Sequence, residues 1–142
     1  MKKLPNCLFI FCFLMSSNWL AAQDQTATLK VNLTNFQENG HIVRVGLCNA
    51  AKDWLKTGIQ GKNIMVKNGQ AVAIFDNLPK GQYAISCYYD INGNGELDTG
   101  FLGIPKEPYA FSNNPSTTFG PPKFEKAMIE VSEGEKEITI TF

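Results

Sequence analysis

The sequence predicts an all-β fold, a single antiparallel β-sandwich of about seven short strands with a long loop after an acidic turn. Apolar residues alternate with polar ones in many short segments, which is the period of a half-buried strand. Turn signals separate these segments at short intervals, and no segment sustains a helical period of apolar residues. Together these observations favour two packed sheets over a helical or mixed fold.

The first two expected strands show the alternation most clearly. The segment "TATLKVNLTN" places on one face Ala27, Leu29, Val31 and Leu33. After a turn at 38–40, the segment "HIVRVGLCN" places on one face Val43, Val45 and Leu47. Residues 50–62 are less regular, and "AAKDWLKTG" within them is compatible with one helical turn. Each strand is therefore expected to bury one face and expose the other.

Further turn signals divide the rest of the chain. The segment "NIMVKNGQAVAIFDN" reads as a hairpin whose turn is Asn68-Gly69, a strong local hairpin signal. A second turn, "LPKGQ", precedes the strand "QYAISCYYD". The stretch from Thr99 to Lys123, rich in Pro, Gly and Asn, is the expected long loop, and "KAMIEV" and "KEITITF" close the fold. A small outer-membrane barrel needs strands of about 9–11 residues with an outward apolar band, and most of these strands are shorter.

The N-terminal segment has the layout of a secretory signal peptide. Lys2 and Lys3 are followed by the unbroken apolar run 8–15, and Ala21-Ala22 are small residues that suit a cleavage site. We expect a signal peptide at 1–22, with an uncleaved anchor as the alternative, and a β-sandwich domain at 23–142. The protein is then expected to be secreted, or to lie in the periplasm or cell envelope.

The composition of the expected mature chain limits its partners. Removal of residues 1–22 takes away two of the 13 Lys and Arg and none of the 13 Asp and Glu, which leaves a net charge of −2. Phosphate binding needs clustered Lys and Arg, so no nucleic-acid partner is expected. No later segment is long and apolar enough to span a membrane. Unknown envelope proteins and glycans remain as expected partners.

Two cysteines, Cys48 and Cys87, remain after the expected signal peptide. An exported protein meets an oxidising compartment, so these residues are candidates for a disulfide. The alternative is a pair of separate buried thiols, because free cysteine is among the most buried residue types. The sequence leaves both readings open.

The acidic turn "YDINGNGELD" carries oxygen-bearing side chains at alternate positions. It matches the first nine positions of an EF-hand loop, with a glycine at position six where the chain must turn sharply. The candidate ligands at positions one, three, five, seven and nine are Asp90, Asn92, Asn94, Glu96 (through its backbone carbonyl) and Asp98. Calcium takes six to eight oxygen ligands, so these residue types predict calcium as the bound ion.

The loop also departs from an EF-hand. Position twelve, where a bidentate Glu is expected, is Phe101, and no helix is evident on either side. The missing ligands must come from elsewhere, and the nearest candidates in the sequence are Glu107, Asn113 and Asn114. The alternative is a tight Asn/Gly turn whose carboxylates are solvated.

The long loop is rich in aromatic residues and forms a candidate ligand surface. Aromatic faces backed by Asn side chains can stack on sugars or peptides. The residues of this candidate surface are Phe101, Tyr109, Phe111, Asn113 and Asn114. The alternative, which we favour, is a loop folded over the sandwich with its aromatics in a satellite core.

No catalytic residue is assigned, and the protein is not expected to be an enzyme. The chain has one histidine, His41, beside a turn, and a hydrolase triad needs a base near a nucleophile and an orienting acid. One His and two dispersed Cys give no zinc-ligand spacing.

The segments "YYDINGNGELDTGFLGIPKEPYAFSNN", "LPKGQYAI" and "PPKFEKA" carry a resemblance to a known family. With them the chain resembles an uncharacterised family of small secreted bacterial proteins, a domain of unknown function, over most of the expected mature chain. This resemblance implies export and a compact β domain, and no activity. More loosely, "FDNLPKGQYAI" leading into the acidic turn is similar to transthyretin-like (prealbumin-like) sandwich domains, some of which hold calcium in such loops. The expected sandwich is therefore of the Ig-like or transthyretin-like type.

These observations predict an exported, non-catalytic β-sandwich module with an EF-like calcium-binding loop, acting as a binding or structural component of the envelope or exterior. The alternatives are an unrecognised metal-assisted enzyme and a glycan-binding protein.

Overall fold

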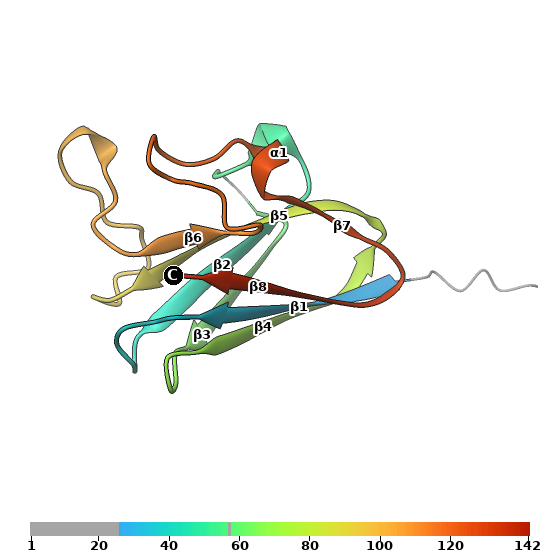
Figure 1. The fold of residues 1–142 in the computed structure, drawn as a ribbon, viewed down its shortest axis with the longest axis horizontal. Helices are drawn as coiled ribbons and strands as arrows, with labels where there is room; N and C mark the ends of the chain where they lie inside the picture. The colour runs from blue at the N-terminus through green and yellow to red at the C-terminus, as the bar shows by residue number, and fades with distance from the viewer. Residues whose placement is uncertain (1–25, 57) are drawn as a thin grey trace, which may run out of the picture.

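The computed structural model describes residues 26–56 and 58–142, which form two packed β-sheets (Figure 1). Eight strands and three short helical segments make up these residues. The predicted all-β sandwich is confirmed. The expected signal peptide at 1–22 lies outside the described residues, and no helix within them is long and apolar enough to cross a bilayer.

The smaller sheet has three strands in the order β4 (Ala71–Pro79), β1 (Thr26–Thr34) and β8 (Gly134–Thr141). β1 pairs antiparallel with β4 and parallel with β8. The parallel pair differs from the expected antiparallel arrangement. It arises because the chain changes sheets between β7 and β8, so β8 enters the smaller sheet running in the direction of β1.

The larger sheet has five strands, and all of its pairs are antiparallel. Its order is β3 (Gln60–Met65), β2 (Ile42–Cys48), β5 (Gly81–Asp90) and β6 (Tyr109–Phe111), and β7 (Met128–Val131) pairs with the first residues of β5. β6 and β7 therefore share one edge of β5. The helical segments η1 (Ala51–Asp53), η2 (Phe101–Gly103) and α1 (Phe124–Ala127) lie in the connections.

The Asn68-Gly69 turn forms, but it does not join two strands of one sheet. Both residues have positive φ, and Lys67 and Gln70 exchange backbone hydrogen bonds of 2.9 and 3.0 Å across it. The strand before the turn, β3, belongs to the larger sheet, whereas β4 after it belongs to the smaller one. The expected hairpin is therefore corrected to a tight turn that carries the chain from one sheet to the other.

The core lies between the two sheets and contains the residues whose alternation predicted the strands. Both β1 and β2 bury one face, as expected from their period-two pattern. The largest fully buried side chains there include Leu29, Leu33, Val43, Leu47, Phe75, Ile85 and Ile140. A second cluster lies outside this core and contains Cys48, Ala84, Phe111, Phe124 and Ala127, with Trp54 packed against it.

The two cysteines lie on opposite faces of the larger sheet. Cys87 pairs with Val45 and belongs to the main core, whereas Cys48 pairs with Ala84 and belongs to the second cluster. Both thiols are free and buried, which corrects the disulfide reading in favour of separate thiols. Successive side chains of a strand point to opposite faces, so no local adjustment brings these two together. Burial also raises the pKa of the Cys87 thiol.

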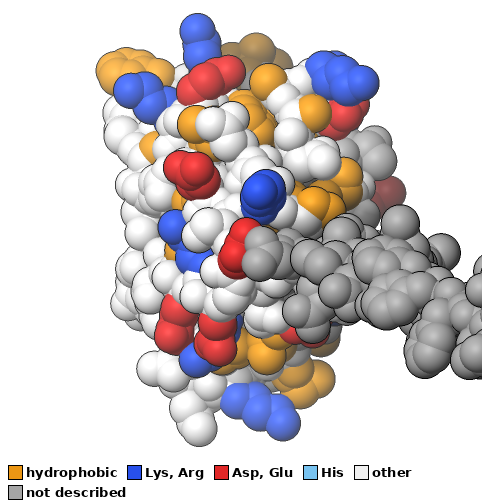
Figure 2. Space-filling model, turned by 90° about the vertical axis from the view of Figure 1, so that its right-hand side faces the viewer, with side chains coloured by type: hydrophobic (Ala, Val, Ile, Leu, Met, Phe, Trp, Pro, Cys, Tyr) orange, Lys and Arg blue, Asp and Glu red, His pale blue; other side chains and the backbone are white. Residues whose placement is uncertain are grey.

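One end of the sandwich presents a surface of mixed charge. Figure 2 shows acidic and basic side chains interspersed there, with hydrophobic side chains between them, around the grey atoms. On the face drawn, no stripe of a single sign of charge is present outside the grey region.

Candidate functional site

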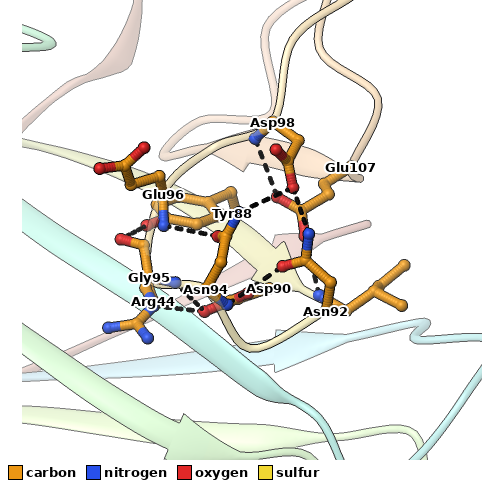
Figure 3. Close-up of polar contacts among 10 residues, drawn as sticks. Arg44, Tyr88, Asp90, Asn92, Asn94, Gly95, Glu96, Asp98 and Glu107 are labelled. Carbon is orange, nitrogen blue, oxygen red and sulfur yellow. Dashed lines mark hydrogen bonds and ion pairs between the residues drawn. The ribbon is translucent and has the colours of Figure 1, made fainter.

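The acidic loop begins where β5 ends, at Asp90. In the register between β2 and β5, Asp90 pairs with Ile42, which places it two residues from the position opposite Arg44. Both side chains therefore lie on the outer face of the larger sheet, away from the main core. Arg44 Nε donates to Asp90 Oδ2 at 2.7 Å (Figure 3), and Asp90 is only 1% exposed.

Three of the predicted metal ligands, Asn92, Asn94 and Asp98, lie in hydrogen-bonding contact with one another. Asn92 Oδ1 accepts from the backbone of Asn94 at 3.1 Å, and Asn94 Oδ1 accepts from the backbone of Glu96 at 2.9 Å. Both Asn side-chain nitrogens donate to Asp98 Oδ2 (Figure 3). The Glu96 carboxylate points away from these groups, which agrees with a role through its backbone.

Glycines give the loop its tight curvature. Gly93 and Gly95 have φ angles of 73° and 89°, in the left-handed region that favours glycine. Gly95 also donates its backbone N–H to Asp90 Oδ2 at 3.0 Å. This residue stands at position six of the EF-like pattern, where the sharp turn was expected.

Glu107 closes the loop from the segment before β6. Its Oε1 accepts from the backbone of Ile91 at 2.9 Å, and its Oε2 accepts from the backbone of Asp98 at 3.1 Å. One buried carboxylate thus ties the two ends of the loop together. The sequence named Glu107 as a candidate for a missing ligand, and it reaches the loop, but its oxygens receive backbone N–H groups.

The other two candidates for missing ligands lie elsewhere. Asn113 donates to the backbone carbonyl of Met128 at 2.8 Å. Asn114 donates to the carbonyl of Thr139 and accepts from the backbone of Thr141. Both residues therefore tie the chain after β6 to neighbouring strands. The amide nitrogens of both residues and the amide oxygen of Asn114 are engaged in these contacts, and their places in the metal site and on a ligand surface stay predictions.

The electrostatics of the loop are set by Asp90 and Arg44. Burial opposes ionisation of Asp90, but hydrogen bonds from Arg44 and from the backbones of Gly95 and Gly93 outweigh it and lower the pKa of Asp90. The hydrogen bond to Asp90 raises the pKa of Arg44. Asp90 Oδ1 is buried and has no hydrogen-bond partner among the described residues. Such an oxygen is costly unless something satisfies it.

The charged side chains alone do not make a metal site. Across residues 26–56 and 58–142, no three His, Cys, Asp or Glu side chains converge as metal ligands. An ion in the loop would therefore depend on the Asn oxygens and on backbone carbonyls as well as on Asp90 and Asp98. Oxygen ligands of this kind suit calcium, and they suit transition metals poorly.

Beside the loop, a cleft of about 520 Å³ lies on the outer face of the larger sheet. Tyr109 and Phe111 of the predicted ligand surface line it, whereas Phe101 stands 86% exposed in η2. Tyr109 and Phe111 also pack edge to face, with ring centroids 5.7 Å apart, and both contribute to the second cluster. The satellite core expected beneath the long loop is present for Tyr109 and Phe111, with a cleft next to it, whereas Phe101 and Phe119 of the same loop lie outside it and are exposed.

Sequence reasoning missed the floor of this cleft, which includes Gly46, Gly61 and Ser86. It also missed Arg44, which lines the cleft and pairs with the acidic loop. The available signal was the small size of the three floor residues, which all face outward in β2, β3 and β5. Those residues become neighbours only in the register of β3, β2 and β5.

The fold and the site define a two-sheet β-sandwich with an Asp/Asn/Gly loop at the end of its longest strand. The chain belongs to a bacterial family, DUF2141, described as an uncharacterized protein conserved in bacteria, which matches residues 31–139. The expected family resemblance is therefore confirmed. No curated protein and no solved structure matches the chain, and the likeness to Ig-like or transthyretin-like domains stays a prediction.

Proposed function

We propose that the chain is an exported, non-catalytic β-sandwich module whose loop 90–98 binds one calcium ion. The observation that carries this proposal is the buried oxygen Oδ1 of Asp90, which stands at position one of the loop and lacks a hydrogen-bond partner among the described residues. A cation at this oxygen would satisfy it. The ion would also hold the loop rigid for contact with an envelope protein or a glycan.

The residue types of the loop support a hard cation with oxygen ligands. Asn92, Asn94 and Asp98 already lie within hydrogen-bonding distance of one another. Their amides could turn their oxygens to an ion, because Asn92 Oδ1 and Asn94 Oδ1 accept only backbone N–H groups at present. The carbonyl of Glu96 would add a backbone oxygen, as at position seven of an EF-hand.

The charges in the loop indicate a weak site. Two carboxylates, Asp90 and Asp98, would supply the charged ligands, and the guanidinium of Arg44 offsets one of them. Fewer net charges mean lower affinity, so the site belongs with extracellular calcium modules, at a dissociation constant on the order of 10⁻⁴ to 10⁻³ M. Magnesium should bind less well, because it requires octahedral geometry and keeps its waters.

Two features argue against catalysis by a histidine base or a cysteine nucleophile. His41 lies 3.5 Å from Glu38 and packs edge to face against Tyr89, which gives it a structural environment at the start of β2. The raised pKa of Cys87 keeps that thiol protonated, so it is a poor nucleophile. Export is proposed from the charged and apolar pattern of residues 1–22.

Thermal melting of the purified protein tests the calcium proposal. At calcium tenfold above the dissociation constant, RT ln(1 + [L]/Kd) gives about 1.4 kcal/mol, a rise of a few degrees in the melting midpoint relative to chelator. Asp98→Asn should abolish most of this rise. It is the sharper variant, because removal of Asp90 also breaks the ion pair with Arg44. Glu125→Gln, at an exposed position of α1, is the matched control and should keep the full rise.

The outcome that overturns the proposal is a wild-type melting midpoint that is the same in calcium and in chelator. A rise of equal size in Asp98→Asn would overturn the assignment of the ion to this loop. In either case the loop would be an Asn/Gly turn held by Arg44 and Glu107 alone.

A further inference from the structure

We infer that the cleft on the outer face of the larger sheet binds a small molecule that combines a flat apolar ring system with a carboxylate. The cleft has a volume of about 520 Å³, within the range of about 300–1,000 Å³ typical of small-molecule sites. Nothing in this inference depends on calcium, because the floor of the cleft is made of strand residues.

The floor is a row of small residues across three neighbouring strands. Gly46 of β2 pairs with Gly61 of β3 on one side and with Ser86 of β5 on the other. All three residues line the cleft. The row therefore forms a flat strip of backbone with almost no side chains above it, wide enough for a planar group to lie on the sheet.

The fold itself does not require these glycines. Neither Gly46 nor Gly61 has a positive φ angle. A Cβ atom at Gly46 would meet nothing nearer than Ser86 Oγ at 3.5 Å, and one at Gly61 nothing nearer than a backbone oxygen at 3.8 Å. Glycine inside a strand is destabilising relative to a residue with a side chain, and it often marks a place where a ligand approaches the backbone closely.

Aromatic and apolar groups enclose the strip. Phe111 continues the same row beyond Ser86, and Tyr88 pairs with Tyr109 in the adjacent row. Leu55 and Pro105, from the connections before β3 and before β6, form further parts of the wall. Aromatic side chains of this kind pack well against the face or edge of a ring, so an apolar ring system suits the enclosure.

Arg44 supplies a positive group at the margin of the strip. Its Nε donates to Asp90, and its Nη1 lies 3.3 Å from the side-chain oxygen of Asn63 when that amide is oriented to satisfy both groups. The described residues provide no hydrogen-bond partner for Nη2, and the side chain is 27% exposed. Lys56 and Asp53 also line the cleft and carry opposite charges. Arg44 is the remaining charged residue of the lining, and its Nη2 stays available to a ligand although its Nε is paired with Asp90.

These observations define the recognition chemistry. A carboxylate accepts charge-assisted hydrogen bonds from a guanidinium, which are stronger than bonds between neutral groups. The ring system of the same molecule would lie on the strip between Gly61 and Phe111. A sugar would instead need several polar partners along the strip, and the strip offers one hydroxyl, that of Ser86.

The test uses amide NMR spectra of the purified protein during titration with 2-naphthoate and with the neutral analogue 2-naphthylmethanol. We expect saturable shifts for the amides around Gly46, Gly61, Ser86 and Phe111 with 2-naphthoate. The neutral analogue should bind about tenfold to hundredfold more weakly, because it loses a hydrogen bond to a charged group. The titration is run in chelator and again in calcium, so that failure here is distinguishable from failure of the calcium proposal.

Gly46→Leu fills the strip and should abolish the shifts. Thr139→Leu is the matched control, because it adds the same side chain to the outer face of the smaller sheet, and it should bind as the wild type does. If Gly46→Leu fails to fold, Gly61→Leu takes its place, since that position is at least as open. The inference is overturned if 2-naphthoate gives no saturable shifts at the strip, if both naphthalenes bind equally, or if Gly46→Leu binds normally. N-acetylglucosamine binding there in place of 2-naphthoate would overturn it as well.

Discussion

The guanidinium of Arg44 and the carboxylate of Asp90 form an ion pair, with Nε 2.7 Å from Oδ2, at the point where β5 becomes the acidic loop. Arg44 also lines the cleft on the outer face of the same sheet. The loop and the cleft are therefore joined through one side chain. Tyr88 makes a second link, because it lines the cleft and its hydroxyl donates to the carbonyl of Gly95 at 2.7 Å.

The ion pair predicts a dependence of stability on pH. The pKa of Asp90 is lower in the folded protein than its ordinary value of 3.8, so the unfolded chain binds the proton more tightly. Asp90 therefore stabilises the fold above about pH 4, and this contribution is lost as the pH falls through the lower, folded-state pKa. Urea unfolding between pH 2 and pH 7 should show a smaller loss on acidification in Asp90→Asn than in the wild type.

Glu125→Gln serves as the control for this experiment and should follow the wild-type curve. Glu137 contributes in the same direction, since hydrogen bonds from Asn32 and Lys30 lower its pKa, so some acid dependence should remain in Asp90→Asn. Parallel curves for the wild type and Asp90→Asn would contradict the assignment.

Removal of the Ser112 hydroxyl should destabilise the fold. It is fully buried, accepts from the backbone N–H of Ile85 at 2.9 Å and donates to the carbonyl of Ala127. Ser112→Ala leaves that buried N–H without this partner and should lower the free energy of unfolding by about 1–3 kcal/mol. Chemical denaturation measures the change, and Ser116→Ala, at an exposed position, should stay within about 0.5 kcal/mol of the wild type.

The cysteines should both be found as thiols. Cys48 and Cys87 are buried on opposite faces of the larger sheet. Alkylation followed by mass spectrometry should label both residues in denatured, unreduced protein and label Cys87 slowly in folded protein, because burial and a raised pKa suppress its thiolate. A peptide pair linked through these two residues would contradict the structure.

Export is tested by the sequence of the mature N-terminus. Protein recovered from the periplasm or the medium should begin near Gln23, because Ala21-Ala22 provide the small residues that signal peptidase requires. Intact Met1 on protein in the membrane fraction would instead indicate an uncleaved anchor.

The strands could be predicted from the sequence because period-two alternation is a local property, whereas the assignment of strands to sheets is not. The turn at Asn68-Gly69 has the same local conformation whether the strands on its two sides pair with each other or enter different sheets. The Asn-Gly dipeptide therefore predicted the turn correctly. The pairing of β3 with β4 that it predicted is wrong, because β3 pairs with β2. The parallel pairing of β1 with β8 likewise depends on a crossover that no short segment encodes.

The acidic loop shows the same contrast between local features, which the sequence predicts, and features that depend on distant parts of the chain. The spacing of Asn92, Asn94 and Asp98 is local, and in the structure these three side chains lie in hydrogen-bonding contact, while Asp90 accepts from the backbone of Gly95. The contribution of Arg44 could not be predicted, because it depends on the register of β2 against β5. Glu107 was expected near the loop, but its role as an acceptor of two backbone N–H groups depends on the path of the long loop. The cleft was missed for the same reason, since its floor exists only when three strands are aligned.

The parallel pairing of β1 with β8 has a consequence for how the chain reaches its native state. Partners such as Ala27 and Gly134 are separated by 107 residues, so the smaller sheet cannot be completed until residues 134–141 have been synthesised. Contacts of such high sequence separation slow folding, because a large loop must close before they form. If the protein is exported as proposed, this delay would keep the nascent chain unfolded and competent for translocation until it has crossed the membrane.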